Sequence, residues 1–304
     1  MAAGAPERGA AALNHPHPPI VVNRPARVSG PPMRVVLLNA RGGVRFDGIV
    51  QCLTRPPLDG ASIILLCESD WRLGRSGRRE IAAELAAALE LSFAYVPEYG
   101  TGGAFMGNAI LSAQPFDEVK VAALPEVAPP VRGRAGGPTG LVTRVQVRNV
   151  ALTVGVAHLH SRCAPAGRER QMRAYLEQLP ARGPAIVGGD FNTTTRELRG
   201  LRAIFATAFR AAVNPQRYHA PERYEPLFER LAEYGFDVRE ANQADRPTFT
   251  FAGLVPARLR PKLDWLATRE VRPVPNSAAV VPARTSPLSR RVSDHEFVML
   301  DIKL

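Results

Sequence analysis

The stretch Ala185-Ile186-Val187-Gly188-Gly189-Asp190-Phe191-Asn192 sets the interpretation of the whole chain. It begins as an apolar run without polar alternation, which is typical of a strand covered on both faces. Asp190 and Asn192 follow where this strand ends. Because a rigid strand can present side chains at its end to a shared cleft, the stretch predicts a functional position on an α/β scaffold.

The same arrangement recurs at other strand ends. Asn39 closes Val-Val-Leu-Leu-Asn, Glu68 closes Ile-Ile-Leu-Leu-Cys-Glu, and His158 follows Val-Gly-Val-Ala. Asp264 lies within Lys-Leu-Asp-Trp-Leu, and Ser293-Asp294-His295 immediately precedes the last apolar run. The β-rich runs predict strands at 34–39, 62–68, 92–96, 108–112, 141–147, 152–158, 185–189, 262–267 and 297–302.

Amphipathic stretches alternate with these runs. Apolar residues at three- and four-residue spacing predict helices at 78–90, 168–179, 197–209 and 222–234. Thr194 followed by Glu197 is a capping box for the third of them. Gly-, Pro- and Arg-rich loops are expected at 128–140, 213–221 and 282–292. The alternation favours sheets covered by helices over a helical bundle or an all-β sandwich.

The N-terminal segment differs from the rest in composition. Residues 1–32 are rich in Ala and Pro and lack the charged start and continuous apolar stretch of a signal peptide. We therefore expect a disordered extension over 1–32, one domain over 33–304 and a cytoplasmic location. The scattered, odd-numbered Cys52, Cys67 and Cys163 argue against a disulfide framework. No apolar run is long enough to predict a membrane-spanning segment.

The charge balance is strongly basic. The formal net charge is +11, and arginine supplies almost all of the positive charge. A basic protein favours anionic partners such as nucleic acid or an acidic membrane surface. A compositional bias of the whole proteome explains the same excess equally well, so charge alone does not identify a partner.

Each polar strand end also has an explanation without function. Asn and Asp are common turn formers that cap backbone groups, and a single histidine is more often a hydrogen-bonded core residue. A strand carboxylate such as Glu68 or Asp264 is harder to explain in this way. Burying an unpaired charge costs several kcal/mol, roughly, unless a cation or a donor compensates. The functional interpretation therefore rests on the whole set of residues.

The motifs together resemble a known family. They are Leu-Asn-Ala-Arg, Cys-Glu-Ser, Gly-Asn-Ala-Ile-Leu-Ser, Ala-His-Leu, Gly-Gly-Asp-Phe-Asn, Leu-Asp-Trp-Leu and Ser-Asp-His. Their order and spacing from Met33 to Leu304 resemble the endonuclease/exonuclease/phosphatase superfamily, with its deoxyribonuclease I-like fold. The resemblance implies a four-layer α/β sandwich, in which two packed mixed β-sheets are flanked by helices and the site lies at one edge.

The resemblance also implies roles for individual residues. Asn39, Glu68 and Asp294 look like metal ligands, and oxygen donors of this kind suit Mg²⁺ or Mn²⁺. Catalytic roles are implied for five residues: His158 as proton donor or phosphate ligand, Asp190 and Asn192 as the pair that positions water and phosphate, and Asp264 as the carboxylate that orients His295.

Some assignments stay open at this point. Either Asp190 or His295 could act as general base, because coupled groups in one cleft share their titrations. Glu98 is a candidate partner for His158, by analogy with the deoxyribonuclease branch. His160 and Arg162 lie beyond the strand end and could simply line the cleft. The long signatures of the apurinic-site repair branch are absent from the sequence.

The function expected from this set is metal-dependent hydrolysis of phosphodiester bonds in a nucleic acid, by in-line attack of water. A phosphomonoesterase, or a phospholipid phosphodiesterase acting on sphingomyelin or inositol phosphates, uses the same residues and differs in the loops. A binding protein without turnover would be expected to have lost at least one of them. Ser161 and Ser293 lie outside a Gly-x-Ser-x-Gly elbow, which argues against a serine hydrolase.

Overall fold

The computed structural model describes residues 17–27, 30, 32–127, 135–195, 213–214, 220–251 and 260–304. Its larger sheet contains nine described strands, in which β1, β4, β5, β3, β2, β14 and β12 lie side by side and β7 and β13 pair with β4 and β14. The bounds are β1 Ile20–Val22, β2 Met33–Asn39, β3 Ala61–Trp71, β4 Ser92–Thr101, β5 Ala104–Ser112, β7 Ala135–Gly136, β12 Arg272–Pro273, β13 Ala279–Val281 and β14 Phe297–Lys303.

The smaller sheet has the order β11, β10, β9, β8, β6. Its strands are β6 Phe116–Ala123, β8 Thr139–Val147, β9 Val150–Ala157, β10 Ala185–Asp190 and β11 Asp264–Arg269. The described α-helices are α1 Phe46–Leu53, α2 Ile81–Leu89, α3 Pro165–Leu176 and α6 Leu227–Glu233, with short 3-10 turns η1 Arg41–Gly43, η2 Gly74–Ser76 and η3 Pro221–Arg223. None of the described helices is long and apolar enough to cross a membrane.

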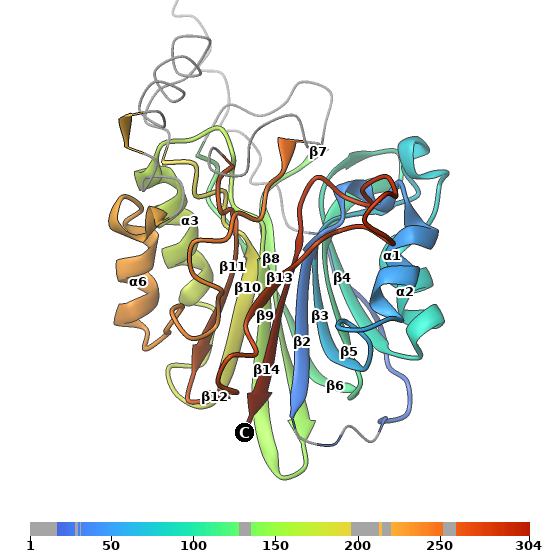
Figure 1. The fold of residues 1–304 in the computed structure, drawn as a ribbon, viewed down its shortest axis with the longest axis horizontal. Coiled ribbons are helices and arrows are strands. Elements are labelled where there is room, and N and C mark those ends of the chain that lie inside the picture. The colour runs from blue at the N-terminus through green and yellow to red at the C-terminus, as the bar shows by residue number, and fades with distance from the viewer. Residues whose placement is uncertain are drawn as a thin grey trace, which may run out of the picture.

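The layers of the fold are defined by the sheet face on which each buried side chain lies. Along β2, Val35 and Leu37 enter the core between the two sheets, whereas Val36 and Leu38 pack against α1 and α2. On the smaller sheet, Trp265 packs with the core beneath α3 and α6. Successive side chains of a strand point to opposite faces, so apolar runs without alternation are what a doubly covered strand requires. The result is the expected four-layer α/β sandwich (Figure 1).

Most expected elements are present, with differences at short segments. All nine predicted strands form, although several are longer than expected. Helix α1 was not predicted because it spans only eight residues. The expected helix at 197–209 lies outside the described residues, as does Glu197, the partner of Thr194 in the expected capping box. Within the segment expected to be disordered, Ile20–Val22 instead forms β1, because the edge of β4 offers backbone partners to it.

The N-terminal segment is therefore expected to contribute stability rather than chemistry. Deleting residues 1–32 should leave turnover intact, since every proposed site residue lies after it, but should lower the melting temperature because the edge of β4 loses its partner. Deleting only residues 1–16 is the control that keeps β1. The measurement is specific activity and thermal unfolding of both truncated chains. A large loss of activity on the longer deletion would contradict this prediction.

Candidate active site

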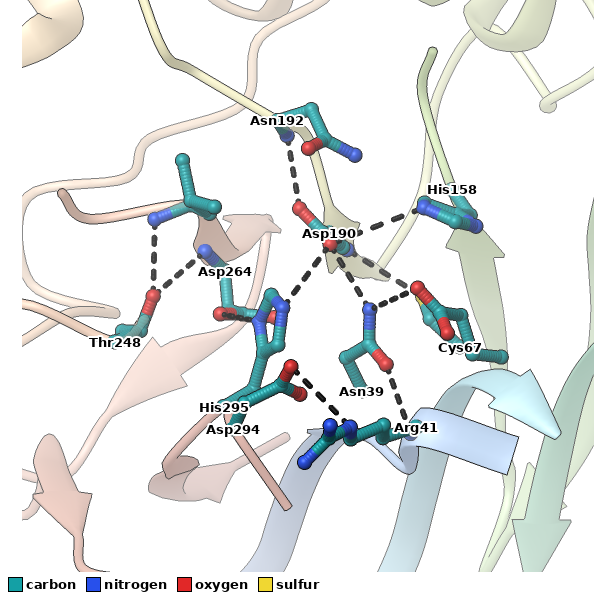
Figure 2. A network of polar contacts seen from close by, with 12 residues as sticks. Asn39, Arg41, Cys67, His158, Asp190, Asn192, Thr248, Asp264, Asp294 and His295 are labelled. Carbon is teal, nitrogen blue, oxygen red and sulfur yellow. Dashed lines mark hydrogen bonds and ion pairs between the residues drawn. The ribbon is translucent and has the colours of Figure 1, made fainter. Parts of the chain in front are cut away.

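The polar strand ends meet at one edge because of strand direction. Strands β2 and β3 are parallel, as are β9 and β10, so their carboxyl ends lie together. Strand β11 runs antiparallel to β10, which places Asp264, its first residue, opposite Asp190. Strand β14 runs antiparallel to β2, so the residues just before β14 reach the same edge. Figure 2 shows the side chains that converge there.

One glycine allows the two middle strands to come close enough. Gly189 has φ +153°, and a Cβ at this position would lie 1.8 Å from the carbonyl oxygen of Ala157. Only a residue without a side chain tolerates both this backbone conformation and this contact. Because His158 directly follows Ala157 and Asp190 directly follows Gly189, this close approach brings the side chains of these two proposed site residues together.

The carboxylate of Asp190 lies at the centre of the cluster (Figure 2). Its Oδ2 accepts a hydrogen bond from Asn39 Nδ2 at 3.0 Å and lies 3.8 Å and 3.7 Å from Nε2 of His158 and His295. Its Oδ1 accepts a hydrogen bond from the backbone N–H of Asn192. Burial raises the pKa of Asp190 to about 6, against the opposing effect of the two histidines. One oxygen atom therefore faces both imidazoles.

Asn192 takes a position defined by backbone contacts. Its side-chain Nδ2 donates to the carbonyl of Leu159 at 2.8 Å, and its φ of 50° is left-handed. The residue thus joins the end of β10 to the segment that follows β9. These contacts hold Asp190 in place, and the role in binding phosphate that the resemblance implies for Asn192 remains a proposal.

His295 and Asp264 form a buried pair. Nδ1 of His295 lies 2.8 Å from Asp264 Oδ2, and Asp264 is fully buried. Thr248 Oγ1 accepts the backbone N–H of Asp264, and the Phe249 ring lies edge-on to the imidazole at 4.8 Å. Burial alone would lower the pKa of His295, but the carboxylates of Asp264 and Asp190 outweigh it and raise the pKa to about 10. The pair fixes Nε2 as the imidazole nitrogen that faces Asp190.

His158 has its own carboxylate partner in Glu98. Nδ1 of His158 lies 3.4 Å from Glu98 Oε2, and Glu98 is 1% exposed. Burial opposes protonation of His158, but contact with Glu98 and the nearby Asp190 raises its pKa to about 10. The predicted pairing of Glu98 with His158 is thus present, and both imidazoles carry a carboxylate on the nitrogen that points away from Asp190.

Replacing Glu98 by glutamine should lower the pKa of His158. The substitution removes the charge that favours the imidazolium and leaves burial, which favours the neutral ring. We expect the pKa of His158 to fall well below about 10 in an NMR titration of its ring protons. Titration of the histidine signals of Glu118→Gln, a substitution of a half-buried carboxylate on β6 that pairs with Lys120, is the control. An unchanged His158 titration in Glu98→Gln would show that Glu98 does not set its protonation.

Each of the proposed metal ligands Asn39, Glu68 and Asp294 has a polar partner at this edge. Asn39 Nδ2 also donates to Glu68 Oε1 at 3.2 Å, and Arg41 Nε lies 3.4 Å from Asp294 Oδ2. Burial would raise the pKa of the Glu68 carboxyl, but the two histidines and the Asn39 amide reverse this and lower it. Glu68 is therefore held as a carboxylate, which is the form that binds a cation.

The donor chemistry of this edge suits a hard divalent cation. Asn39, Glu68 and Asp294 offer amide and carboxylate oxygens, which are the donors that Mg²⁺ and Mn²⁺ take. A second grouping, Asp190, Asp264 and His295, has ligand atoms within 4.8 Å of one another. We favour the first set for a metal, because Nδ1 of His295 already engages Asp264 and its ring serves better as a hydrogen-bonded imidazole.

Some neighbouring residues were not found from the sequence. Thr248 and Phe249 come from a segment without a motif, and Arg41 was quoted only within Leu-Asn-Ala-Arg. Arg75 donates to fully buried Asp70 at 2.7 and 2.8 Å, two residues beyond Glu68. His160 lies beyond the cluster and accepts the backbone N–H of Arg162 at its Nδ1, as in a tight turn. The abundance of arginine in the sequence hid Arg41 and Arg75, which have specific partners beside the site.

The comparison with protein families decides the classification. Residues 36–295 match the sequence model of the Endonuclease/Exonuclease/phosphatase family. The chain belongs to the endonuclease/exonuclease/phosphatase family. Enzymes of this family generally hydrolyse phosphate esters and typically depend on divalent metals. The matched range contains every proposed site residue, from Asn39 to His295. No match is found among curated proteins.

Solved structures of the family share the fold. An endonuclease/exonuclease/phosphatase from Beutenbergia cavernae DSM 12333 is 18% identical with a TM-score of 0.63, covering 90% of this chain and 71% of that one. D. rerio TDP2 complexed with single strand DNA product is 17% identical (TM-score 0.56), covering 90% and 100%. Sphingomyelinase C from Streptomyces griseocarneus is 15% identical (TM-score 0.52), covering 90% and 99%. At these identities the likeness establishes the family fold and leaves the substrate open.

Proposed function

We propose that the protein is a divalent-metal-dependent phosphodiesterase that hydrolyses nucleic acid by in-line attack of water. The observation that carries the proposal is the single oxygen Oδ2 of Asp190, which lies within 4 Å of both imidazole Nε2 atoms and accepts the amide of Asn39. Phosphodiester hydrolysis needs a held nucleophile, positive charge near the phosphate oxygens and a proton for the leaving group. This edge of the molecule has a group for each.

Each residue is assigned a role in the reaction from its position in the cluster. Asp190 and His295 hold the attacking water between them. Asp190 accepts its proton as the oxygen approaches phosphorus, because the raised pKa of His295 keeps that imidazole protonated. His158, held by Glu98, donates a proton to a phosphate oxygen or to the leaving oxygen as the ester bond breaks. Asp264 keeps the His295 ring in place. These groups come from strands of both sheets, so the attacking water and the phosphate are held in a rigid geometry.

A metal would complete the positive charge. Asn39, Glu68 and Asp294 would hold Mg²⁺ or Mn²⁺, which when bound polarises the phosphate and stabilises the charge that develops on its oxygens. The lowered pKa of Glu68 supports this assignment, since a protonated carboxyl would not bind a cation.

Two observations favour nucleic acid as the substrate. The first is basic charge: the net charge of +11 suits a polyanion. In addition, Arg41 pairs with the proposed metal ligand Asp294, and Arg75 pairs with Asp70 on the strand that carries Glu68. TDP2, whose structure holds a DNA product, shares the fold. A second candidate is a phospholipid diester, favoured by Leu288, which is 98% exposed on the 282–292 loop near the site.

The test compares substrates with one protein preparation. Purified protein with Mg²⁺ or Mn²⁺ is offered plasmid DNA, RNA, sphingomyelin, inositol phosphates and bis-p-nitrophenyl phosphate. We expect cleavage of nucleic acid and of the small diester, with both activities lost in Asp190→Asn. Turnover of sphingomyelin or inositol phosphates without turnover of nucleic acid would select the second candidate. No turnover of any of them would overturn the proposal.

A further inference from the structure

A hollow lies beside the proposed active site, between the start of α1 and the loop that precedes β14. Its volume is about 510 Å³, and three arginines line it: Arg45, Arg79 and Arg290. The 282–292 loop, red in Figure 1, lies beside α1. A Cβ on Gly48 of α1 would lie 2.6 Å from Val292, so the helix and the loop pack directly together where both line the hollow. None of the proposed catalytic residues belongs to its lining.

The hollow carries an excess of positive charge. Asp47 is the one acidic residue among its eleven lining residues. Arg79 is already paired with Glu84 and stacks over Phe46 at 4.6 Å. Arg45 and Arg290 are exposed and have no ion-pair partner within the described part of the chain. Guanidinium groups placed around one hollow repel each other when no ligand is bound. A bound anion offsets this repulsion by attracting each of them.

Two short segments connect this hollow to the catalytic edge. Val292 lines the hollow, and Asp294 follows only two residues later, at most about 7 Å of extended chain. Ser293, between them, donates to the carbonyl of Asn39 at 2.7 Å, which fixes the segment against the end of β2. On the other side, the η1 turn leads from Asn39 through Arg41 to Arg45. An extended substrate could therefore reach both places at once.

We propose that the hollow binds a further phosphate of a nucleic-acid strand whose scissile phosphate lies at the Asp190 cluster. This inference rests on the proposed phosphodiesterase function and specifies its substrate as a chain with several phosphates. Arginine suits the role because its planar guanidinium donates two parallel hydrogen bonds to a phosphate. The substrate is then positioned by two phosphates, of which only one reacts.

The lining favours a strand over a lipid surface. A lipid-binding face would gather exposed apolar side chains, and the exposed apolar residues at this hollow are Val44 at its rim and Leu288 on the adjoining loop. Exposed apolar residues scattered singly are normal on a protein surface. Charged groups concentrated in one concave site instead match a discrete anionic group.

The test is a binding measurement on the full chain with Mg²⁺ present. A labelled single-stranded phosphorothioate oligonucleotide, which resists cleavage, is titrated against wild-type protein and the double variant Arg45→Gln/Arg290→Gln. Arg148→Gln/Arg182→Gln is the control, because it also removes two exposed arginines but lies at the starts of β9 and β10, opposite the catalytic ends. Melting temperatures of both variants establish that they are folded.

We expect Kd to rise by about tenfold or more in Arg45→Gln/Arg290→Gln, as for the removal of hydrogen bonds to charged groups. The slope of log Kd against log salt should also decrease, by about 0.7 for each phosphate that the variant no longer neutralises. The control should change neither. Equal effects of the two double variants would overturn the proposal, since general charge would then explain binding.

Two further arms separate the alternatives. If Arg45→Gln/Arg290→Gln and Leu288→Asp release the protein from phosphatidylserine vesicles while oligonucleotide Kd is unchanged, the hollow serves a lipid surface and the proposal is overturned. Turnover of bis-p-nitrophenyl phosphate by the wild-type protein tests the catalytic function separately. Failure there refutes the phosphodiesterase function, whereas failure of the binding test alone refutes only the second phosphate site.

Discussion

Replacing His295 by alanine is expected to cut the turnover rate by roughly a hundredfold or more, the range of a general acid or base. The imidazole is lost from its position 3.7 Å from Asp190 Oδ2, so the attacking water loses one of the two groups that hold it. The same substitution should lower the melting temperature, because the fully buried carboxylate of Asp264 loses its partner. The rate and the thermal unfolding are measured on one preparation.

A second substitution separates catalysis from stability. Asp264→Asn removes the buried charge, so the double variant Asp264→Asn/His295→Ala should be more stable than His295→Ala alone. Its rate should be no better than that of the slower single variant, because residues that act as one unit are strongly non-additive. Recovery of the rate together with stability would contradict the catalytic role and identify His295 as a core histidine with a structural partner.

Removing the metal is expected to abolish activity. Chelation with EDTA should do so reversibly, and Glu68→Gln should lower the rate by about a thousandfold or more, since a metal supplies several kcal/mol of transition-state stabilisation. Glutamine keeps the shape of the side chain and can still face Asn39, so the protein should remain folded. The measurement is the rate as a function of Mg²⁺ or Mn²⁺ concentration for both proteins.

A measurement without turnover tests the same assignment. A ligand that binds only the folded state raises its melting temperature. We expect Mg²⁺ to raise the melting temperature of the wild-type protein, with a much smaller effect on Glu68→Gln. Glu118→Gln, which changes a half-buried carboxylate of β6 outside the proposed site, is the matched control and should behave as the wild type. Full activity of thoroughly chelated protein would show that the metal assignment is wrong.

The sheets and their site edge could be predicted because the signals are local and strong. Runs such as Val35 to Leu38 have no polar alternation, which indicates a strand covered on both faces, and two helical layers follow. Polar residues at the ends of such runs then converge wherever strands are parallel. The rule that parallel strands end at the same edge was enough to predict that Asn39 lies near Glu68. It was also enough to predict that His158 lies near Asp190.

The partners of each side chain could not be predicted, because they depend on distances between segments far apart in the sequence. Nothing near Thr248 indicates that its hydroxyl accepts the backbone N–H of Asp264, or that Phe249 packs on His295. Strand β1 was missed for a related reason. Three residues carry little signal of their own, and their conformation comes from the edge of β4.

The antiparallel pairing of β14 with β2 has a consequence for synthesis of the chain. The first site residue, Asn39, ends β2, whereas His295 directly precedes the segment that leads into β14. A nascent chain that ends before His295 would hold Asn39 and Glu68 without that imidazole, and the edge of β2 that β14 covers would be unpaired. Contacts between residues this distant in sequence form late, after long loops have closed. We therefore expect the proposed site to stay incomplete, and without activity, until the segment from His295 through β14 has been synthesised.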